Sequence, residues 1–299
     1  MDSLAQAIFF IATMAILAVT AFLVWELWTQ SGPSRDKFGL SFLTKTEWDP
    51  VAGNFGALPF IFGTVVTSAV ALILAVPFGV GAAIFLAELA PPKASDAMTF
   101  LIELLAAVPS VIFGLIGIFV LLPMLNVIVP VLKDAGLGVL PIFSGPFYGV
   151  SLLAAGVVLS VMVAPYIISV SREVLLAVPR DLREAALALG ATRWETTWDV
   201  VVPYARRGIM GSVFLALARA LGETMAVTMV VGNTPKIAKS LLAPGYSIAS
   251  VLANEFAEAT SSLQVSTLIE LGLVLFGLTI VLNGAARLLI MATGGKVSQ

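Results

Sequence analysis

The fold of this chain is decided by the stretch SREVLLAVPRDLREAALALGATRWETTWDVVVPYARRG, residues 171–208, because it is a charged segment between two long apolar ones. Pro179 and Asp181 are typical of a helix start, and they predict a short helix over residues 182–189. Gly190 follows where a residue with left-handed backbone commonly ends a helix. The first half of the segment therefore predicts a short helix with a defined beginning and end.

The second half of the same segment predicts another short helix. Thr192 and Glu195 have the Thr-x-x-Glu spacing of a capping box. Pro203 interrupts the pattern before the next apolar stretch begins. We call residues 171–207 the elbow, and expect it to be a compact helix–turn–helix unit with a small approachable surface at Ala185 and Ala186. A plain surface-lying connection is the alternative that spacing alone leaves open.

The composition on either side of the elbow is that of an integral membrane protein. The 299 residues are 59% hydrophobic and 11% charged, whereas soluble domains have roughly 45–50% and about 25%. The sequence contains no cysteine and no histidine, which excludes disulfides, thiol chemistry, the usual zinc sites and a histidine base. A net charge of −2 gives no indication of nucleic-acid binding.

Six stretches are long and apolar enough to cross a bilayer, which takes about 20 residues. The sequence thus predicts an all-α polytopic membrane protein with one permease-like domain over residues 1–299. The expected spans are residues 4–28, 58–89, 98–126, 147–170, 208–231 and 265–292. The first has no Lys or Arg ahead of its apolar core, which favours a retained helix over a secretory signal peptide.

The distribution of basic residues predicts the orientation, because cytoplasmic loops are enriched in Lys and Arg. The elbow carries the densest cluster: Arg172, Arg180, Arg183, Arg193, Arg206 and Arg207. We therefore expect the elbow to be cytoplasmic, and with six spans both termini lie on that side as well.

The elbow also resembles the EAA loop of bacterial ABC-importer permeases. EAALALG, residues 184–190, is followed by nine residues and then by VVVP, residues 200–203. Val200 stands where the family more often has isoleucine. The resemblance implies a coupling helix that docks on an ATP-hydrolysing subunit. The coupling candidates are Arg183, Glu184, Ala185, Ala186, Gly190 and Pro203.

Four further stretches resemble the PstC family of phosphate-importer permeases: residues 77–91, 108–114, 221–233 and 247–259. LGETMAVTMVVGN, residues 221–233, favours PstC over the similar PstA family. The resemblance implies a type I ABC importer permease fold in a bacterial inner membrane. It also implies three protein partners, namely a homologous permease PstA that completes a heterodimer, an ATPase dimer PstB and a periplasmic phosphate-binding protein PstS.

A charged pair interrupts ALARALGETMAV, residues 216–227, near the middle of the fifth expected span. A charge at the bilayer centre costs about 2.5–3.5 kcal/mol on insertion scales. Arg219 and Glu223 are four residues apart, which would place them on one face of a continuous helix. The pair could simply neutralise itself, or join this helix to Glu103 or Glu270 on other spans.

The implied substrate suggests a sharper role for the pair. Phosphate needs a cation along its path, and a guanidinium matches a tetrahedral oxyanion with a fork of donors. In this hypothesis Glu223 holds Arg219 until phosphate arrives, and Thr224 adds a hydroxyl donor. Ser110 follows Pro109 in a proline-broken span, where exposed backbone can line a cavity; an ordinary kink is the alternative there.

The remaining patterns predict a transport subunit and no enzyme. The chain has no G-x-x-x-x-G-K-[ST] phosphate loop, so ATP hydrolysis belongs to another subunit, and we expect no catalytic residue, metal or cofactor. A permease for molybdate or sulfate is the main alternative, and a secondary anion transporter is a second. Competition among oxyanions would separate the substrates, and ATP dependence would separate the pump from the carrier.

Overall fold

The structure is a computed structural model, and it describes residues 2–293. Helices make up most of this part of the chain, with one isolated β-bridge between Asp49 and Asn54. The α-helices are α1 Asp2–Gln30, α2 Gly32–Phe38, α3 Leu58–Ile84, α4 Pro92–Ala106, α5 Ser110–Ile116, α6 Leu122–Asp134, α7 Leu152–Leu176, α8 Arg180–Ala188, α9 Arg193–Glu195, α10 Val202–Gly222, α11 Met225–Val230, α12 Ile248–Glu255 and α13 Ser262–Thr293.

Short helical segments of other types complete the chain. Three of them are π-helical and continue neighbouring α-helices: η2 Phe85–Leu89, η3 Gly117–Leu121 and η6 Thr196–Val201. Three more are 3-10 helices: η1 Gly39–Leu43, η4 Leu137–Val139 and η5 Pro141–Phe143. A π-helical turn inserts an extra residue and redirects the side chains that follow it.

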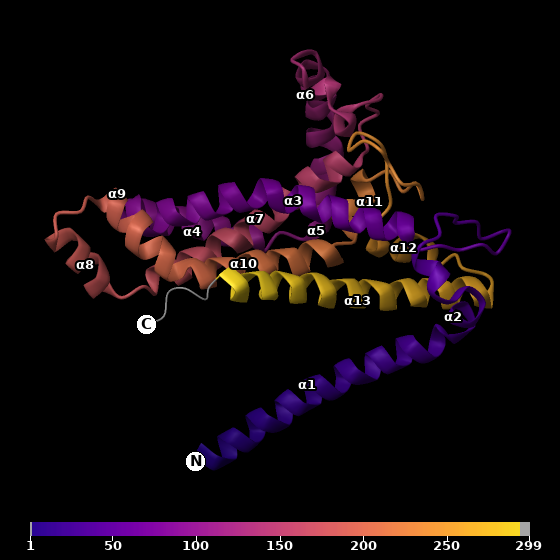
Figure 1. The fold of residues 1–299 in the computed structure, drawn as a ribbon, viewed down its shortest axis with the longest axis horizontal. Helices are drawn as coiled ribbons and strands as arrows, with labels where there is room; N and C mark the ends of the chain where they lie inside the picture. Colours follow the sequence, from indigo (N-terminus) through magenta and orange to yellow (C-terminus); the bar gives the residue numbers. More distant parts are fainter. Residues whose placement is uncertain (1, 294–299) are drawn as a thin grey trace.

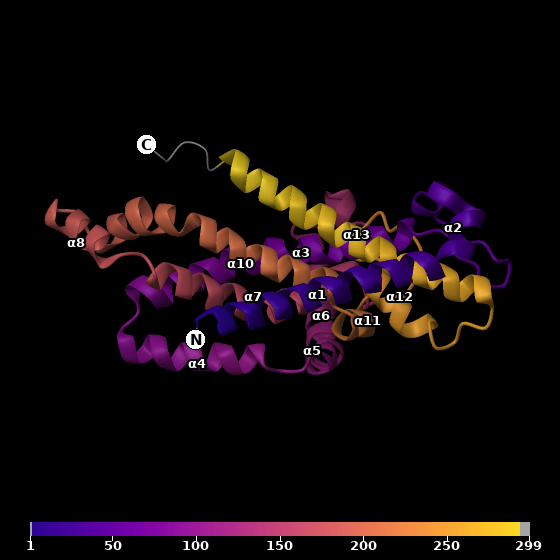
Figure 2. The same cartoon turned by 90° about the horizontal axis from the view of Figure 1, so that it is seen from below.

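Six of the described helical stretches are long and apolar enough to cross a membrane, which confirms the predicted number of spans. They are Gln6–Gln30, Leu58–Leu89, Ser110–Asp134, Leu152–Leu176, Arg193–Gly222 and Ser262–Leu288. Helices α3, α7, α10 and α13 lie along the long axis of the molecule (Figure 1). The elbow helix α8 lies at one end of this axis, and α2 and α12 lie at the other (Figures 1 and 2).

The centre of the bundle is formed by α3, α7 and α10, which pack directly on one another. Glycines allow this close approach. A Cβ added at Gly156 would lie 2.4 Å from the side chain of Val70, and one at Gly79 would lie 2.9 Å from that of Ile167. In a membrane such small residues let helices gain dispersion contacts, so the helices of the core are held by tight packing.

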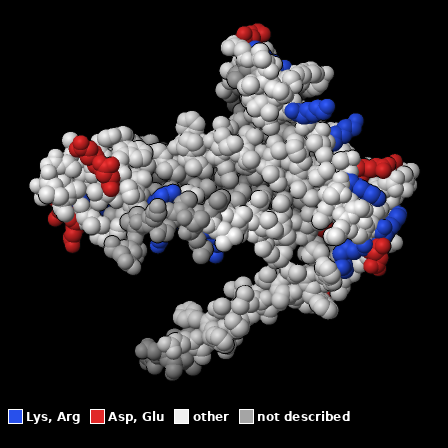
Figure 3. All heavy atoms as spheres, viewed as in Figure 1, with Lys and Arg blue, Asp and Glu red and all other residues white. Residues whose placement is uncertain are grey.

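Helix α1 diverges from this bundle (Figure 1). No residue in the apolar window of its span is buried, and the helix contacts α13 and α2. The charged side chains gather towards the two ends of the long axis and the tip of the α6 arm, while the middle of the visible face is largely uncharged (Figure 3). This distribution is the one expected for a bundle whose middle lies in hydrocarbon.

The third expected span, residues 98–126, is not one helix. Helix α4 ends at Ala106 and α5 begins at Ser110, with Pro109 extended at φ −58° and ψ 140°. A proline lacks an N–H donor and disfavours helical backbone in the residue before it, so the chain breaks here. The apolar helix continues instead to Asp134, and its second half, α6, projects away from the bundle (Figure 1).

The end opposite the elbow has its own small core. Phe42, Phe55, Phe60 and Leu268 are each almost fully buried there. Trp48 donates a hydrogen bond from Nε1 to an oxygen of Glu255 at 2.9 Å, which ties the loop before α3 to α12. Residues 29–57, which are too polar to span, thus form a folded cap over α12 and α13.

Candidate functional site

The fifth apolar stretch is interrupted at the charged residues. Helix α10 ends at Gly222, because Glu223 has extended backbone at φ −70° and ψ 125°. Thr224 follows, and the short helix α11 begins at Met225. The expected continuous span over residues 208–231 is therefore wrong at this point, and Arg219 lies in the last turn of α10 instead of mid-helix.

Arg219 is half-buried and has unused donors. Its guanidinium carbon lies 4.3 Å from the centroid of the Tyr166 ring, a cation–π contact that contributes about 0.5–2 kcal/mol. Its Nε is buried and has no hydrogen-bond partner. A buried donor left without a partner costs about 1–3 kcal/mol, so an acceptor that reaches this group would be bound favourably.

Tyr166 fixes the place of that guanidinium. It comes from α7, and its hydroxyl donates a 2.9 Å hydrogen bond to the carbonyl oxygen of Ala106 at the end of α4. The ring is thus held between the α4–α5 break and the α10–α11 break. Sequence reasoning missed Tyr166, because nothing in its own span distinguishes a packing tyrosine from one that supports an arginine.

Glu223 does not pair with Arg219. Among residues 2–293, none of the ion pairs within 4.0 Å joins it to Arg219, so the predicted Arg219–Glu223 pair is absent. Glu223 instead accepts a 3.2 Å hydrogen bond from the backbone N–H of Ala226. A carboxylate at this position caps the start of a helix and complements its dipole, so Glu223 has a structural task of its own.

Arg219 also does not join α10 to Glu103 or Glu270 of another span, which was the alternative. Glu103 lies in α4 and Glu270 in α13, and neither forms an ion pair with Arg219 in the described part of the chain. Glu270 is buried where α13 packs on α2, and its Oε2 has no hydrogen-bond partner.

The two chain breaks meet in space. Helices α5 and α11 pack closely together. A Cβ added to Gly114 would lie 3.3 Å from Cα of Ala226, and one added to Gly117 would lie 2.8 Å from the side chain of Val230. These contacts advance in the same direction along both helices, so the helix starts lie at the same end. Ser110 and Thr224 are consequently on the same side as Arg219 and Glu223.

The first half of the elbow is built as its sequence predicts, whereas the second half is not a separate short helix. From Arg193 the segments α9, η6 and α10 form one continuous helix to Gly222, and Pro203 lies in the first turn of α10 and does not interrupt it. Helix α8 ends before Gly190, whose φ of +90° is the expected left-handed value. Thr192 and Glu195 form the capping box: the N–H of Glu195 donates to the Thr192 hydroxyl, and the N–H of Thr192 donates to the Glu195 carboxylate at 2.7 Å.

The surface of the elbow is apolar and accessible. Leu189 is 90% exposed, and Leu187, Trp194 and Trp198 are exposed beside it, with the two tryptophan rings in edge contact. Glu184 and Ala185 also face outward. Exposed apolar groups gathered at one end of a molecule are typical of a protein-binding surface.

The family model for "Binding-protein-dependent transport system inner membrane component" matches residues 75–292. This chain belongs to that family.

Curated members are similar over nearly the whole permease. A phosphate transport system permease protein PstC of Mesorhizobium japonicum is 44% identical over 297 residues, covering 97% of this chain and 91% of the relative. One of Haemophilus influenzae is 48% identical over 286 residues, covering 94% and 88%. A "PstC 2" of Mycobacterium tuberculosis is 40% identical over 293 residues, covering 95% and 88%.

A solved structure supports the fold of this permease. An inward-facing MetNI methionine ABC transporter aligns with a TM-score of 0.56 at 17% identity, covering 78% of this chain and 94% of that chain. The predicted all-α, six-span ABC importer permease fold is thereby confirmed. A permease of this family is a membrane transport subunit and not itself an enzyme, as expected from the sequence.

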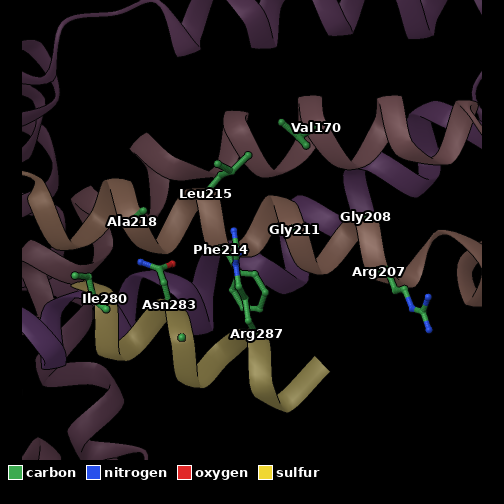
Figure 4. A pocket seen from close by; sticks show the side chains of 11 residues that line it. Val170, Arg207, Gly208, Gly211, Phe214, Leu215, Ala218, Ile280, Asn283 and Arg287 are labelled. Atoms are coloured by element: carbon green, nitrogen blue, oxygen red, sulfur yellow. The ribbon is translucent and has the colours of Figure 1, made fainter. Parts of the chain in front are cut away.

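Two features of this permease were not expected from its sequence. A cavity of about 810 Å³ lies between α10 and α13, where Asn283 points from α13 towards α10 (Figure 4). Ala218 lines it but Arg219 does not, so the cavity is separate from the Arg219 site. The second feature is Arg183, which the motif places on the coupling surface but which turns inward to Glu88.

Proposed function

We propose that the chain is the permease subunit of an ATP-driven, binding-protein-dependent importer of inorganic phosphate. The observation that carries this proposal is the guanidinium of Arg219, which is half-buried at a helix break and has a buried Nε with no hydrogen-bond partner. The phosphate transport permeases that resemble the chain over most of its length supply the class of anion.

The chemistry of phosphate fits this guanidinium. Phosphate carries one to two negative charges at neutral pH, and a guanidinium offers a planar fork of donors to such an oxyanion. Because Glu223 is occupied as a helix cap, Arg219 needs no internal ion pair to be broken before it meets the anion. Thr224 and Ser110 provide hydroxyl groups on the same side of the α5–α11 pair.

The elbow is proposed as the docking surface for an ATPase dimer of the PstB kind. Its exposed Leu187, Leu189 and Trp194 would fill an apolar groove on that subunit. A homologous permease of the PstA kind would complete the pathway beside Arg219. A phosphate-binding protein of the PstS kind would deliver the anion at the α2–α12 end.

The arginine-rich elbow supports an orientation in the bacterial inner membrane. Basic loops stay in the cytoplasm, so the α8 end is assigned to the cytoplasmic side. Helix α1 starts towards that end (Figure 1), and an even number of spans returns the chain to it. Both termini are therefore proposed to be cytoplasmic.

Transport would proceed by alternating access. ATP binding closes the ATPase dimer and displaces the elbow, which opens the pathway on the α2–α12 side. Phosphate then leaves its binding protein and meets Arg219. Hydrolysis returns the elbow and opens the pathway to the cytoplasm.

Phosphate uptake by the complete complex in liposomes tests this function. We expect labelled phosphate to accumulate only when ATP and the binding protein are present, and excess sulfate or molybdate to leave the initial rate unchanged. Competition by either oxyanion would reassign the substrate. Uptake that follows an ion gradient without ATP would instead identify a secondary transporter.

A further inference from the structure

Arg183 of the elbow donates four hydrogen bonds. Its two nitrogens Nη2 and Nε donate to the two oxygens of Glu88 at 2.7 and 3.2 Å. The same guanidinium donates to the carbonyl oxygen of Leu175 at 2.8 Å, and to that of Val178. One side chain of α8 thus holds the last turn of α7 and the end of the span that contains α3.

The position of Glu88 depends on the π-helical segment η2, which continues α3. The side chains of Glu88 and Arg183 are only 10% and 19% exposed, although they are 95 residues apart in the sequence. A planar, two-point contact between guanidinium and carboxylate fixes orientation as well as distance. The pair is therefore a rigid connection and not a loose surface contact.

A second arginine strengthens the same corner. Arg172 of α7 donates to the Ser95 hydroxyl at 3.2 Å, and that hydroxyl donates to the carbonyl oxygen of Leu86 in η2 at 2.8 Å. Its ion pair with Asp96 is longer, at 3.7 Å, and Asp96 is 78% exposed. Exposed pairs of this kind contribute little, about 0–1 kcal/mol, so the Glu88–Arg183 contact is the principal connection.

We propose that Glu88 and Arg183 are positioning residues that make the elbow helix α8 move as one body with α3 and α7. This inference rests on the proposed function, because it assigns the path by which movement of the ATPase reaches the spans. Helix α3 packs along α7 and α10, so a displacement of α8 carried to Glu88 is delivered to the centre of the bundle. The inward contact does not use the outward-facing side chains of α8, because Glu184 and Ala185 are exposed while the side chain of Arg183 is only 19% exposed.

The Glu88→Gln variant of the complete complex tests the proposal. Glutamine keeps the size of the side chain but removes its charge. We expect the phosphate moved per ATP hydrolysed to fall about tenfold, the order expected for losing a hydrogen bond to a charged group. ATP hydrolysis itself continues, since the apolar docking surface is intact. The matched control is Asp96→Asn, which removes the exposed carboxylate beside Arg172 and is expected to leave the ratio unchanged.

A purely stabilising pair gives a different result. In that case Glu88→Gln lowers the amount of assembled complex, measured by co-purification with the ATPase, while the ratio of phosphate to ATP in the surviving complex stays at the wild-type value. An unchanged ratio would overturn the proposal. If the wild-type complex moves no phosphate, the proposed substrate is wrong. The Glu88–Arg183 contact is then still tested by the cross-link described next, which can be followed through the ATP-driven conformational change of the complex.

The absence of native cysteine in this chain allows a direct test of rigid movement. Glu88→Cys and Arg183→Cys are combined and joined by a short, reducible bifunctional thiol reagent. We expect the reduced double variant to couple poorly, because the ion pair is lost. Cross-linking should restore its transport, or its ATP-driven change in fluorescence from a probe on α10, because the two positions do not separate during the cycle. Loss of activity on cross-linking, with recovery on reduction, would show that the contact opens during the cycle and would refute the proposal.

Discussion

Arg183 and Arg219 have the same side chain and opposite surroundings. Arg183 donates to a carboxylate and to two backbone carbonyls, and its partners come from η2, from the last turn of α7 and from the loop before α8. Arg219 rests on the ring of Tyr166 with a buried Nε that has no partner. The first guanidinium is fully used by the fold, whereas the second is held in place with donors still available.

We propose that this difference divides the work of a transporter between the two regions. A satisfied guanidinium transmits force, because moving it means breaking several charge-assisted hydrogen bonds. An unsatisfied one binds ligand, because an arriving oxyanion supplies the missing acceptors. Each of the two roles can be tested by removing one charge and measuring whether the coupling to ATP hydrolysis or the phosphate uptake rate falls.

Removal of the Arg219 charge is expected to have the largest effect. In Arg219→Gln the phosphate uptake rate should fall about a hundredfold, since a charged donor worth roughly 3 kcal/mol is lost. The complex should assemble normally, because a charge has been removed from the membrane. Uptake into liposomes, normalised to co-purified ATPase, measures this. Wild-type uptake in this variant would remove Arg219 from the pathway.

The double variant Arg219→Gln with Glu223→Gln sharpens that result. If the two charges only neutralised each other, removing both would restore transport. Because Glu223 caps α11 and is not paired with Arg219, we expect the double variant to transport as poorly as Arg219→Gln alone. Recovery of the initial uptake rate in the double variant would contradict the division between the two arginines.

A change at Gly190 tests the elbow with an intermediate effect. Its φ of +90° is one that valine rarely adopts, and the strain costs about 1–2 kcal/mol. Gly190→Val should keep ATP hydrolysis but lower the phosphate moved per ATP about tenfold, the equivalent of 1.4 kcal/mol.

Gly145→Val is the matched control for this strain. Gly145 lies in the loop between α6 and α7, has φ +86°, and like Gly190 has no atom within 4 Å of an added Cβ. We expect its transport ratio to stay at the wild-type value. Equal losses in both variants would mean that backbone strain anywhere impairs the complex, and the elbow would lose its special role.

The smallest effect is expected at Tyr166. Tyr166→Phe keeps the ring under Arg219 and removes the hydrogen bond to Ala106, a loss of about 0.5–1.5 kcal/mol in stability. Transport should change less than about threefold, while the thermal midpoint of the complex falls. Tyr166→Leu, which removes the ring as well, should reduce uptake further. If both variants behave alike, the ring has no part in placing the guanidinium.

The sequence alone determined the features that depend on neighbouring residues. Six apolar stretches, the capping box at Thr192 and Glu195, and the left-handed Gly190 follow from patterns only a few residues long. Caps and periodicity act over one or two turns, so they can be read without knowing what the helix packs against.

Only the tertiary structure decided which charges meet. Four-residue spacing predicts an Arg219–Glu223 pair if the helix continues, but α10 ends at Gly222 and directs Glu223 to α11. Glu88 and Arg183 are 95 residues apart, and they meet because η2 packs against α7 and α8 follows the end of α7. A buried charge takes the partner that packing brings within reach, and that choice depends on the whole bundle instead of any local stretch.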